Sequence, residues 1–325
     1  MTVAPLLRIE GLSVGYSIPG PLFAAHRVLR AVQGVSFDLA AGETLGVVGE
    51  SGCGKSTLGR AVLGLITASG GRVVWDGRDI AEGTRAERRW LRRAMTVIFQ
   101  DPLASLNPRM TVGAIVREPL DIFEPTLAES ERRRRVAEAL RRVGLPENAV
   151  ERYPHQFSGG QCQRIGIARA IILKPRMIVC DEAVSALDVS VQAQIVTLLD
   201  DLRREEGVAL LFISHNLAVV RQISDRVMVL YLGKVMEIAD RGSLYAAPAH
   251  PYTRALLSAV PVPDPDIERN RQRVGLIGEL PSPLNPPSGC VFRTRCPLAV
   301  ERCASEVPAL RQMSATHQVA CHLAG

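Results

Sequence analysis

The chain has 325 residues, of which 47% are hydrophobic, enough for one large domain with an appendage or for two domains. No apolar run approaches the roughly 18 residues that a membrane-spanning helix needs, and the first residues lack the pattern of a secretory signal, so we expect a cytosolic protein. The net charge of +6 rests almost entirely on arginine, because only Lys55, Lys174 and Lys234 are lysine, and a coding bias explains this better than a nucleic-acid partner.

Strand-like and helix-like segments alternate over the first three quarters of the chain. Residues 1–40 and 71–80 have the pattern of antiparallel edge strands, and "WDGRD" is the turn of a hairpin. Near-continuous apolar runs at residues 44–50, 177–180 and 208–214 are each followed by a helical pattern. Such runs indicate a mainly parallel sheet covered by helices on both faces, so the predicted fold class is α/β.

A helix-rich stretch at residues 101–157 interrupts this alternation and predicts an inserted helical subdomain. Within it, "SERRRRVAEALRRVG" places Val136, Leu140 and Val143 on one stripe of a helix and the arginines on the others. This arginine run and a similar one at residues 85–93 have acidic neighbours. Solvated helix faces are therefore favoured over a nucleic-acid-binding surface.

A glycine-rich loop, "GESGCGKST" at residues 49–57, follows a buried strand, opens a helix pattern and matches G-x-x-x-x-G-K-[ST]. Its glycines let backbone N–H groups curl around a polyphosphate, and the helix N-terminus adds positive potential. Lys55 is expected to reach the β- and γ-phosphates, and the Ser56 hydroxyl to ligate Mg2+. A chance glycine-rich turn would not account for the strand–loop–helix context. The predicted nucleotide contacts are Gly49, Ser51, Gly52, Cys53, Gly54, Lys55, Ser56 and Thr57.

An acidic pair ends the apolar run of "RMIVCDEA" at residues 176–183. A carboxylate at the tip of a strand beside a phosphate loop can hold Mg2+ through water, and Asp181 fits this role. The adjacent Glu182 can polarise the attacking water. The pair alone would be a weak signal, but downstream of a phosphate loop it is a strong one.

A second anion-binding nest is indicated by "FSGGQCQR" at residues 157–164, where a serine and two glycines stand at the start of a helix. One nucleotide does not need two phosphate nests on one chain. Two chains facing head to tail would use both, because each lends its nest to the ATP of the other. The residues concerned are Ser158, Gly159, Gly160 and Gln161.

These motifs and their order resemble those of ATP-binding-cassette (ABC) ATPases over residues 1–240. The resemblance implies a P-loop fold with a RecA-like, mainly parallel sheet, an antiparallel β subdomain and a helical subdomain at about residues 101–173. It matches Gln100 to the Q-loop glutamine, which senses Mg2+ and the γ-phosphate and contacts the membrane part of the transporter. It also implies that Asp188 in "SALD" communicates across the dimer and that His215 in "FISHN" steadies the γ-phosphate and the water.

The sequence departs from the usual pattern of that family at several places, among them Ala183, where the family often has proline, and Cys162 after the signature loop. Phe157 stands where the signature loop more commonly has leucine. Tyr16 in "VGYS" is the aromatic expected to stack on adenine, with Phe23 as a competitor because "SIPGPLFAAHRVLR" lengthens the usual spacing. Taken alone, each aromatic is more often a core residue than a nucleotide platform.

After about residue 240 the chain becomes rich in proline and predicts an extension with few regular elements, residues 241–325. The segments at residues 249–265 and 278–299, together with "QDPLASLNPR", resemble ATP-binding subunits of oligopeptide/dipeptide importers. The resemblance implies a pair of ATPase subunits, a heterodimer or a homodimer, at the cytoplasmic face of the membrane. It further implies two permease subunits, an extracytoplasmic solute-binding protein and no nucleic acid.

Four cysteines gather in this extension with the spacing C-x5-C-x6-C-x17-C. The spacing lacks the C-x2-4-C pair of a zinc site and differs from common ferredoxin spacing, yet four thiolates in a poorly cored segment suggest a metal staple. The resemblance implies a [4Fe–4S] cluster, and zinc or free thiols are the alternatives. The expected ligands are Cys290, Cys296, Cys303 and Cys321. Cys53, inside the phosphate loop, raises the separate hypothesis that thiol reagents inhibit the ATPase.

The expected function is ATP hydrolysis by a cassette dimer that drives import of oligopeptides or dipeptides, with Glu182 as the base and His215 and Gln100 assisting. Related subunits serve importers of nickel, glutathione or oligosaccharides, and the sequence does not separate these because the cassette never touches the solute. The rival class is a soluble cassette that acts on nucleic acid or ribosomes. Such proteins usually carry two cassettes or a long coiled-coil insertion, and this sequence has one cassette and no sustained heptads.

Overall fold

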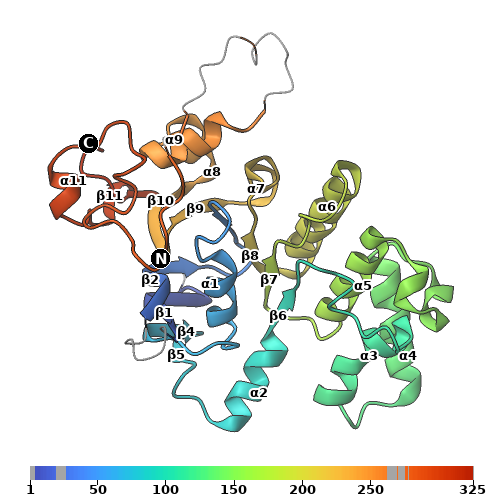
Figure 1. Cartoon of the computed structure of the whole chain (residues 1–325). Coiled ribbons are helices and arrows are strands. Elements are labelled where there is room, and N and C mark those ends of the chain that lie inside the picture. The colour runs from blue at the N-terminus through green and yellow to red at the C-terminus, as the bar shows by residue number, and fades with distance from the viewer. Residues whose placement is uncertain (1–3, 20–26, 262–268, 270–274, 277, 325) are drawn as a thin grey trace. The chain divides into compact units, whose positions relative to one another are not determined.

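The computed structural model of the chain, drawn in Figure 1, describes residues 4–19, 27–261, 269, 275–276 and 278–324. The chain divides into two compact units. Unit 1 comprises Met1–Pro5, Leu39–Thr44 and Glu82–Ser214, and unit 2 comprises Leu6–Asp38, Leu45–Ala81 and His215–Gly325. In the described part of the chain, no helix is long and apolar enough to cross a membrane. The domain boundary expected at residue 240 rests on sequence motifs and does not coincide with this division. It stays a prediction.

Unit 1 contains three parallel strands, as the apolar runs predict. β7 (Met177–Asp181) pairs with β6 (Met95–Ile98) on one side and with β8 (Ala209–Ile213) on the other. Every residue of β7 and β8 is buried, which explains why these strands are unbroken apolar runs and not alternating ones. The helix α2 (Arg85–Ala94) precedes β6, and α6 (Val189–Glu206) follows β7.

Three other helices of unit 1 pack against one another (Figure 1): α3 (Val112–Phe123), α4 (Glu129–Arg142) and α5 (Gly159–Ile171), with the 3-10 turns Glu147–Glu151 and Pro154–Gln156 between α4 and α5. α4 is the helix expected from the arginine-rich run. Val136, Leu140 and the adjacent Val143 are buried, while Arg134 pairs with Glu131 at 2.8 Å on the opposite face. Hydrogen bonds from Arg134 and its neighbouring arginine lower the pKa of Glu131 to about 2. These contacts agree with a solvated, ion-paired helix face.

An antiparallel sheet in unit 2 has the strand order β2-β1-β4-β5, formed by β1 (Leu7–Ile18), β2 (Arg27–Leu39), β4 (Gly70–Trp75) and β5 (Arg78–Asp79). Asp76 and Gly77 connect β4 to β5 with φ values of 50° and 80°. Positive φ at both central residues is the mark of a tight hairpin turn, which Asp-Gly favours. The expected edge hairpin at "WDGRD" is therefore present.

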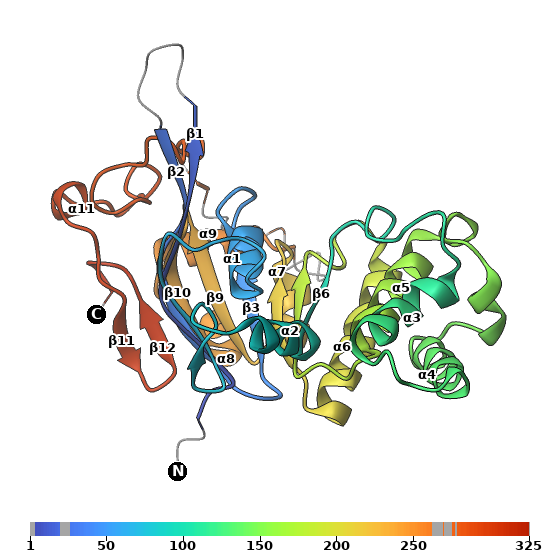
Figure 2. The same ribbon diagram turned by 90° about the horizontal axis from the view of Figure 1, so that it is seen from below.

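The second sheet of unit 2 contains both parallel and antiparallel pairs. β9 (Arg226–Tyr231) runs parallel to β3 (Thr44–Val48) and antiparallel to β10 (Lys234–Asp240). β12 (His317–Val319) pairs with β10, and β11 (Arg311–Ser314) pairs with β12, as Figure 2 shows. The C-terminal extension thus adds two strands to a sheet that begins more than 200 residues earlier in the chain.

The extension has more regular structure than its proline content predicts. Its helices are α8 (Arg241–Ala246), α9 (Pro251–Ser258) and α11 (Arg302–Ser305), and unit 2 also contains α1 (Lys55–Val62) and α7 (Leu217–Ile223). Proline is compatible with these elements because it stands at the first position of α9, where a helix needs no N–H donor. Sequence periodicity gave no signal for β11 and β12 because each has only three or four residues.

Glu237 of β10 joins the extension to the sheet. Its side chain has no exposed surface and accepts hydrogen bonds from the backbone N–H groups of Ala249 and His250, at 2.7 and 2.9 Å. His317 Nε2 lies 2.7 Å from the same carboxyl group. We expect Glu237→Gln to lower the free energy of unfolding by about 1–3 kcal/mol, because the amide would turn an N–H donor toward one of these N–H groups. Thermal and urea unfolding measure this loss.

Glu306→Gln is the matched control for that prediction. Glu306 pairs with Arg302 at 2.7 Å, but both side chains are more than half exposed. Exposed ion pairs contribute about 0–1 kcal/mol, so this variant should unfold nearly as the wild type does. Equal stabilities of the two variants would contradict the role given to Glu237.

Candidate functional site

The residues predicted from the sequence to form the site are divided between the two units. Unit 2 contains Tyr16, the phosphate loop at residues 49–57 and His215. Unit 1 contains Gln100, Ser158, Gly159, Gly160, Gln161, Asp181, Glu182 and Asp188.

The phosphate loop connects β3 to α1 and is closed on itself by its lysine. Lys55 Nζ donates to the backbone carbonyl of Gly49 at 2.8 Å and to that of Glu50 at 3.0 Å. Gly49, Gly52 and Gly54 have φ values of 151°, 77° and 105°. Residues other than glycine rarely adopt such φ values. The glycines therefore permit a tight loop whose backbone can face an anion.

Close packing against other segments of unit 2 also requires glycine at two of these positions. A Cβ atom at Gly49 would lie 2.2 Å from the carbonyl oxygen of Leu230, and one at Gly54 would lie 2.1 Å from that of Ala31. The N–H of Gly233 also donates to the carbonyl of Cys53 at 2.9 Å. The loop therefore rests on β2 and on the β9–β10 turn, and its shape depends on segments far away in sequence.

Cys53 is enclosed by this packing, with only 1% of its surface exposed. Burial raises the pKa of the Cys53 thiol, although the nearby Lys55 lowers it in part. The thiolate is the form that attacks thiol reagents, and the reagent needs access to the sulfur. The structure thus argues against the hypothesis that Cys53 makes the ATPase sensitive to such reagents.

We expect Cys53 to resist alkylation by iodoacetamide in the native protein at neutral pH and to react fully in denaturant. Mass spectrometry of peptides measures both. Cys296 and Cys321 are partly exposed and provide an internal control in the same sample. Alkylation of Cys53 as fast as that of Cys296 would contradict the expectation.

In unit 1, the acidic pair lies at the carboxyl end of β7. Asp181 is buried as the last residue of the strand. Glu182 has φ = 50°, and its N–H donates to the carbonyl of Ile213 at 3.0 Å. A non-glycine residue with positive φ is held in a strained conformation, and such strain gathers at functional sites. No feature of the sequence indicated this strain.

The signature loop begins α5. Ser158 is the N-cap: the N–H of Gln161 donates to its hydroxyl at 3.3 Å, and its own N–H donates to the side-chain oxygen of Gln161 at 3.0 Å. A Cβ atom at Gly160 would lie 2.6 Å from Val191 of α6. Glycine therefore lets the start of α5 approach the start of α6, while its first-turn amides provide the positive end of a helix.

Asp188 caps the neighbouring helix, α6. Its carboxylate accepts hydrogen bonds from the N–H of Val191 at 2.9 Å and from the Ser190 hydroxyl at 2.7 Å, and these lower the pKa of Asp188. The structure thus assigns this residue a local capping role that the sequence interpretation did not include. The pattern "DVSV" has the form of an N-cap followed by a helix and could have indicated it.

Two side chains of α5 contact the segment that contains Gln100, and the sequence interpretation missed both. Gln163 donates to the carbonyl of Phe99 at 3.5 Å, and Arg169 donates to the carbonyl of Ser105 at 2.7 Å. Gln100 itself is exposed directly after β6. These two hydrogen bonds connect the segment to the helix that begins at the signature loop.

Tyr16 and His215 are both exposed. Tyr16, near the end of β1, has 40% of its surface exposed. Its competitor Phe23 lies outside the described residues. His215 is exposed and precedes Asn216, whose side chain caps α7. Exposure leaves each of these side chains accessible to a ligand.

Burial and the neighbouring thiols of Cys303, Cys296 and Cys321 raise the pKa of the Cys290 thiol, but in the described part of the chain the four C-terminal cysteines are not grouped as a metal site. Cys290 and Cys303 are both buried, and the N–H of Cys290 donates to the carbonyl of Cys303, in α11, at 2.8 Å. Cys321 Sγ instead accepts from its own loop, from the N–H of Leu323 at 3.4 Å. Among the described residues, no three His, Cys, Asp or Glu side chains are grouped so that they could hold a metal ion. The expectation of a [4Fe–4S] cluster is thus not supported.

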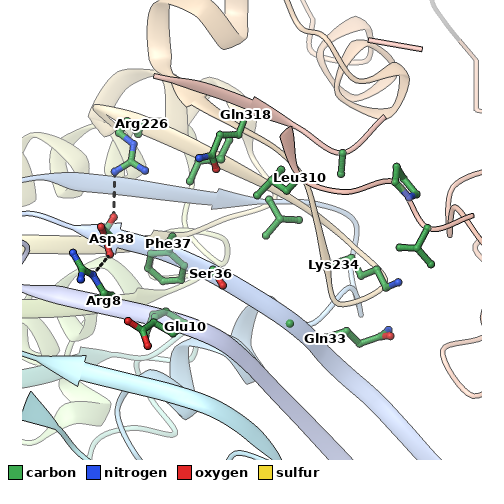
Figure 3. A pocket seen from close by; sticks show the side chains of 17 residues that line it. Arg8, Glu10, Gln33, Ser36, Phe37, Asp38, Arg226, Lys234, Leu310 and Gln318 are labelled. Atoms are coloured by element: carbon green, nitrogen blue, oxygen red, sulfur yellow. Dashed lines mark hydrogen bonds and ion pairs between the residues drawn. The ribbon is translucent and has the colours of Figure 1, made fainter. Parts of the chain in front are cut away.

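A pocket of about 680 Å3 in unit 2 contains none of the predicted site residues (Figure 3). Its polar side chains include Arg8 and Asp38, whose atoms Nε and Oδ1 are 3.0 Å apart. Arg226 donates to the backbone carbonyl of Asp38 at 3.1 Å. Lys234 lines the same pocket, and burial lowers its pKa. The pocket is therefore separate in position and in chemistry from the phosphate loop.

Comparison with known sequences identifies two matching families. A family described as "ABC transporter" matches residues 32–185, and one described as "Oligopeptide/dipeptide transporter, C-terminal region" matches residues 236–303. The oligopeptide transport ATP-binding protein OppF of Haemophilus influenzae is 54% identical over 97% of this chain and 96% of its own length. That of Salmonella typhimurium is 56% identical over 97% of this chain and 95% of its own length.

Solved structures with the same fold are also known. The ATP-binding cassette MJ0796, as a dimer in a post-hydrolysis state bound to ADP and Pi, matches with a TM-score of 0.65 and 28% identity. The match covers 72% of this chain and 98% of that protein. CbiO1 of Clostridium perfringens, part of an ABC transporter complex, matches with a TM-score of 0.64 and 27% identity over 75% of this chain and 91% of its own.

Proposed function

The chain belongs to the ABC transporter family of ATP-binding proteins, and from this premise we propose that it binds and hydrolyses ATP to power import of oligopeptides or dipeptides. The observation that carries the proposal is identity of 54% to an oligopeptide transport ATP-binding protein over 97% of the chain. Because that match includes the C-terminal extension, it supports the peptide-importer branch as well as the ATPase itself.

Within this function, the phosphate loop would bind the triphosphate of ATP through its backbone N–H groups and Lys55. The Ser56 hydroxyl and the Asp181 carboxylate are oxygen donors, the type of ligand that Mg2+ prefers. Mg2+ would neutralise phosphate charge when bound. Glu182 would accept the proton of the attacking water, and His215 and Gln100 would orient the γ-phosphate and that water.

The proposal includes a dimer of ATPase subunits. The signature loop carries a capped helix N-terminus, and a second copy or a homologous subunit could place its own phosphate loop opposite these amides. The MJ0796 cassette, a dimer bound to ADP and Pi, supports such an arrangement. The partner ATPase, two permeases at the membrane and an extracytoplasmic solute-binding protein complete the proposed assembly, with this chain bound peripherally on the cytoplasmic side.

Reconstitution tests the proposal. The chain would be purified from the host together with its permeases and partner ATPase and reconstituted into liposomes. ATP would be supplied on the side of the membrane where the ATPase subunits lie. Uptake of a labelled tripeptide should require ATP and the solute-binding protein, and should fail with a Glu182→Gln subunit. ATP hydrolysis without peptide uptake, but with uptake of nickel, glutathione or an oligosaccharide, would show that the transported solute is not a peptide. ATP hydrolysis stimulated by DNA or RNA would replace the function.

The iron–sulfur cluster remains a separate proposal that rests on the four cysteines and on the resemblance to importer subunits. Against it stands the absence of a metal-binding group among the described residues. Anaerobic purification followed by iron, sulfide and zinc analysis tests it. About four irons and four sulfides per chain, lost in Cys296→Ser, would establish the cluster, whereas a metal-free protein would exclude it without affecting the ATPase proposal.

A further inference from the structure

We propose that Arg295, in the C-terminal extension, is a positioning residue for the phosphate loop and acts by neutralising Glu50. The inference rests on the proposed ATPase function and deepens it. It assigns to the extension a direct effect on the affinity for ATP, through one ion pair between residues that are 245 positions apart.

The ion pair is short and largely removed from solvent. Arg295 Nη1 lies 2.8 Å from Glu50 Oε2, and the two side chains are only 8% and 23% exposed. Glu50 is the second residue of the phosphate loop, between Gly49 and Ser51. Its carbonyl accepts from Lys55 Nζ at 3.0 Å, so the backbone of Glu50 is bound to the residue expected to contact phosphate.

A second contact holds the backbone of Glu50 from the same extension. The N–H of Glu50 donates to the hydroxyl of Tyr252 in α9 at 3.0 Å. This N–H is therefore already occupied by protein, while the carboxylate is occupied by Arg295. The backbone N–H and the carboxylate of Glu50 thus both bind residues beyond residue 240.

Arg295 is held in place by the turns around it and by an aromatic cluster. Its N–H donates to the carbonyl of Phe292 at 3.0 Å. The ring of Phe292 lies 5.3 Å from those of Tyr231 and Tyr252, centroid to centroid, and the guanidinium carbon of Arg295 lies 5.9 Å from the Tyr231 centroid. Edge-to-face packing of this kind fixes the direction from which the guanidinium meets the loop.

The charge of Glu50 explains why such a partner is needed. A carboxylate in a loop that binds a triphosphate repels its ligand, and repulsion is stronger where solvent is excluded. Arg295 removes this repulsion by pairing with the carboxylate and, because guanidinium has several donors, keeps it fixed on one side of the loop. Loss of Arg295 would leave a partly buried, unpaired negative charge beside the phosphates.

A double-mutant cycle tests the inference in the intact transporter complex. Arg295→Met should raise the KM for ATP about tenfold while kcat changes much less, because the affected step is phosphate binding and not proton transfer. Glu50→Gln should raise KM much less than Arg295→Met does, since it removes the charge together with the need for its partner. The double variant should recover most of the lost affinity.

A merely structural role of the ion pair gives a different pattern. If Arg295 only fixed the extension to the loop, Glu50→Gln and Arg295→Met would impair the protein similarly, and the double variant would not recover. That result would overturn the inference. Arg295→Lys, which keeps the charge, should lie close to the wild type in KM, and a KM as high as that of Arg295→Met would equally count against neutralisation.

Two controls separate this test from its premise. Arg302→Met removes an exposed arginine of the same segment and should leave KM unchanged. Binding of ATP to the full-length chain by calorimetry, together with thermal unfolding, gives an affinity that does not depend on turnover. A wild-type complex without ATPase activity would refute the proposed function, whereas normal activity with an unchanged KM in Arg295→Met would refute only the role of Arg295.

Discussion

Replacing Glu182 with glutamine is expected to lower the rate of ATP hydrolysis at least about 100-fold, the contribution of a general base. Glutamine has nearly the same shape, so the N–H bond to the carbonyl of Ile213 and the backbone at φ = 50° should persist. What changes is the ability to accept a proton from water. The affinity for ATP should therefore stay within a few fold of the wild type. Phosphate release and calorimetric ATP binding measure the two quantities.

Glu205→Gln is the control, because this residue of α6 is exposed and pairs with Arg142 at 2.7 Å. It should hydrolyse ATP at the wild-type rate. If Glu182→Gln retained near-normal turnover, another residue would have to supply the base. If it lost ATP binding instead, the side chain would have a structural role that its position at the end of β7 does not suggest.

Replacing Gly49 with alanine is expected to abolish measurable ATP binding and to lower the free energy of unfolding by about 2 kcal/mol or more. Two effects add. A backbone at φ = 151° is unfavourable for alanine, and the new Cβ would lie 2.2 Å from the carbonyl of Leu230 and 2.8 Å from Cys53 Sγ. Since Leu230 belongs to a central strand, the loop must move, and Lys55 loses the Gly49 carbonyl as its partner.

Gly166→Ala is the matched control for this substitution. Gly166 lies inside α5, and a Cβ atom there would have no neighbour within 4 Å. Alanine favours a helix over glycine by about 1 kcal/mol, so this variant should be as stable as the wild type or more stable. Calorimetric ATP binding and urea unfolding compare the two. Retained ATP binding in Gly49→Ala would show that the loop tolerates displacement and that its packing on β9 does not control the site.

The site residues could be proposed from the sequence because their motifs are local. A phosphate loop needs its glycines, Lys55 and Ser56 at fixed spacing within one short segment. Asp181 and Glu182 are likewise adjacent residues at the end of an apolar run. The strands β7 and β8 were predicted for a similar reason: strands buried on both faces are unbroken apolar runs. Short-range patterns of this kind can be recognised directly in the sequence.

The α/β fold class, the expected nucleotide-binding motifs and the importer family could therefore be read from the order of residues alone. The enclosure of Cys53, the strain at Glu182 and the ion pair of Arg295 with Glu50 follow from the packing of distant segments. Each of these depends on which distant segments come into contact. Burial, backbone strain and ion pairing across 245 residues are properties of packing, and no local spacing of residue types specifies them.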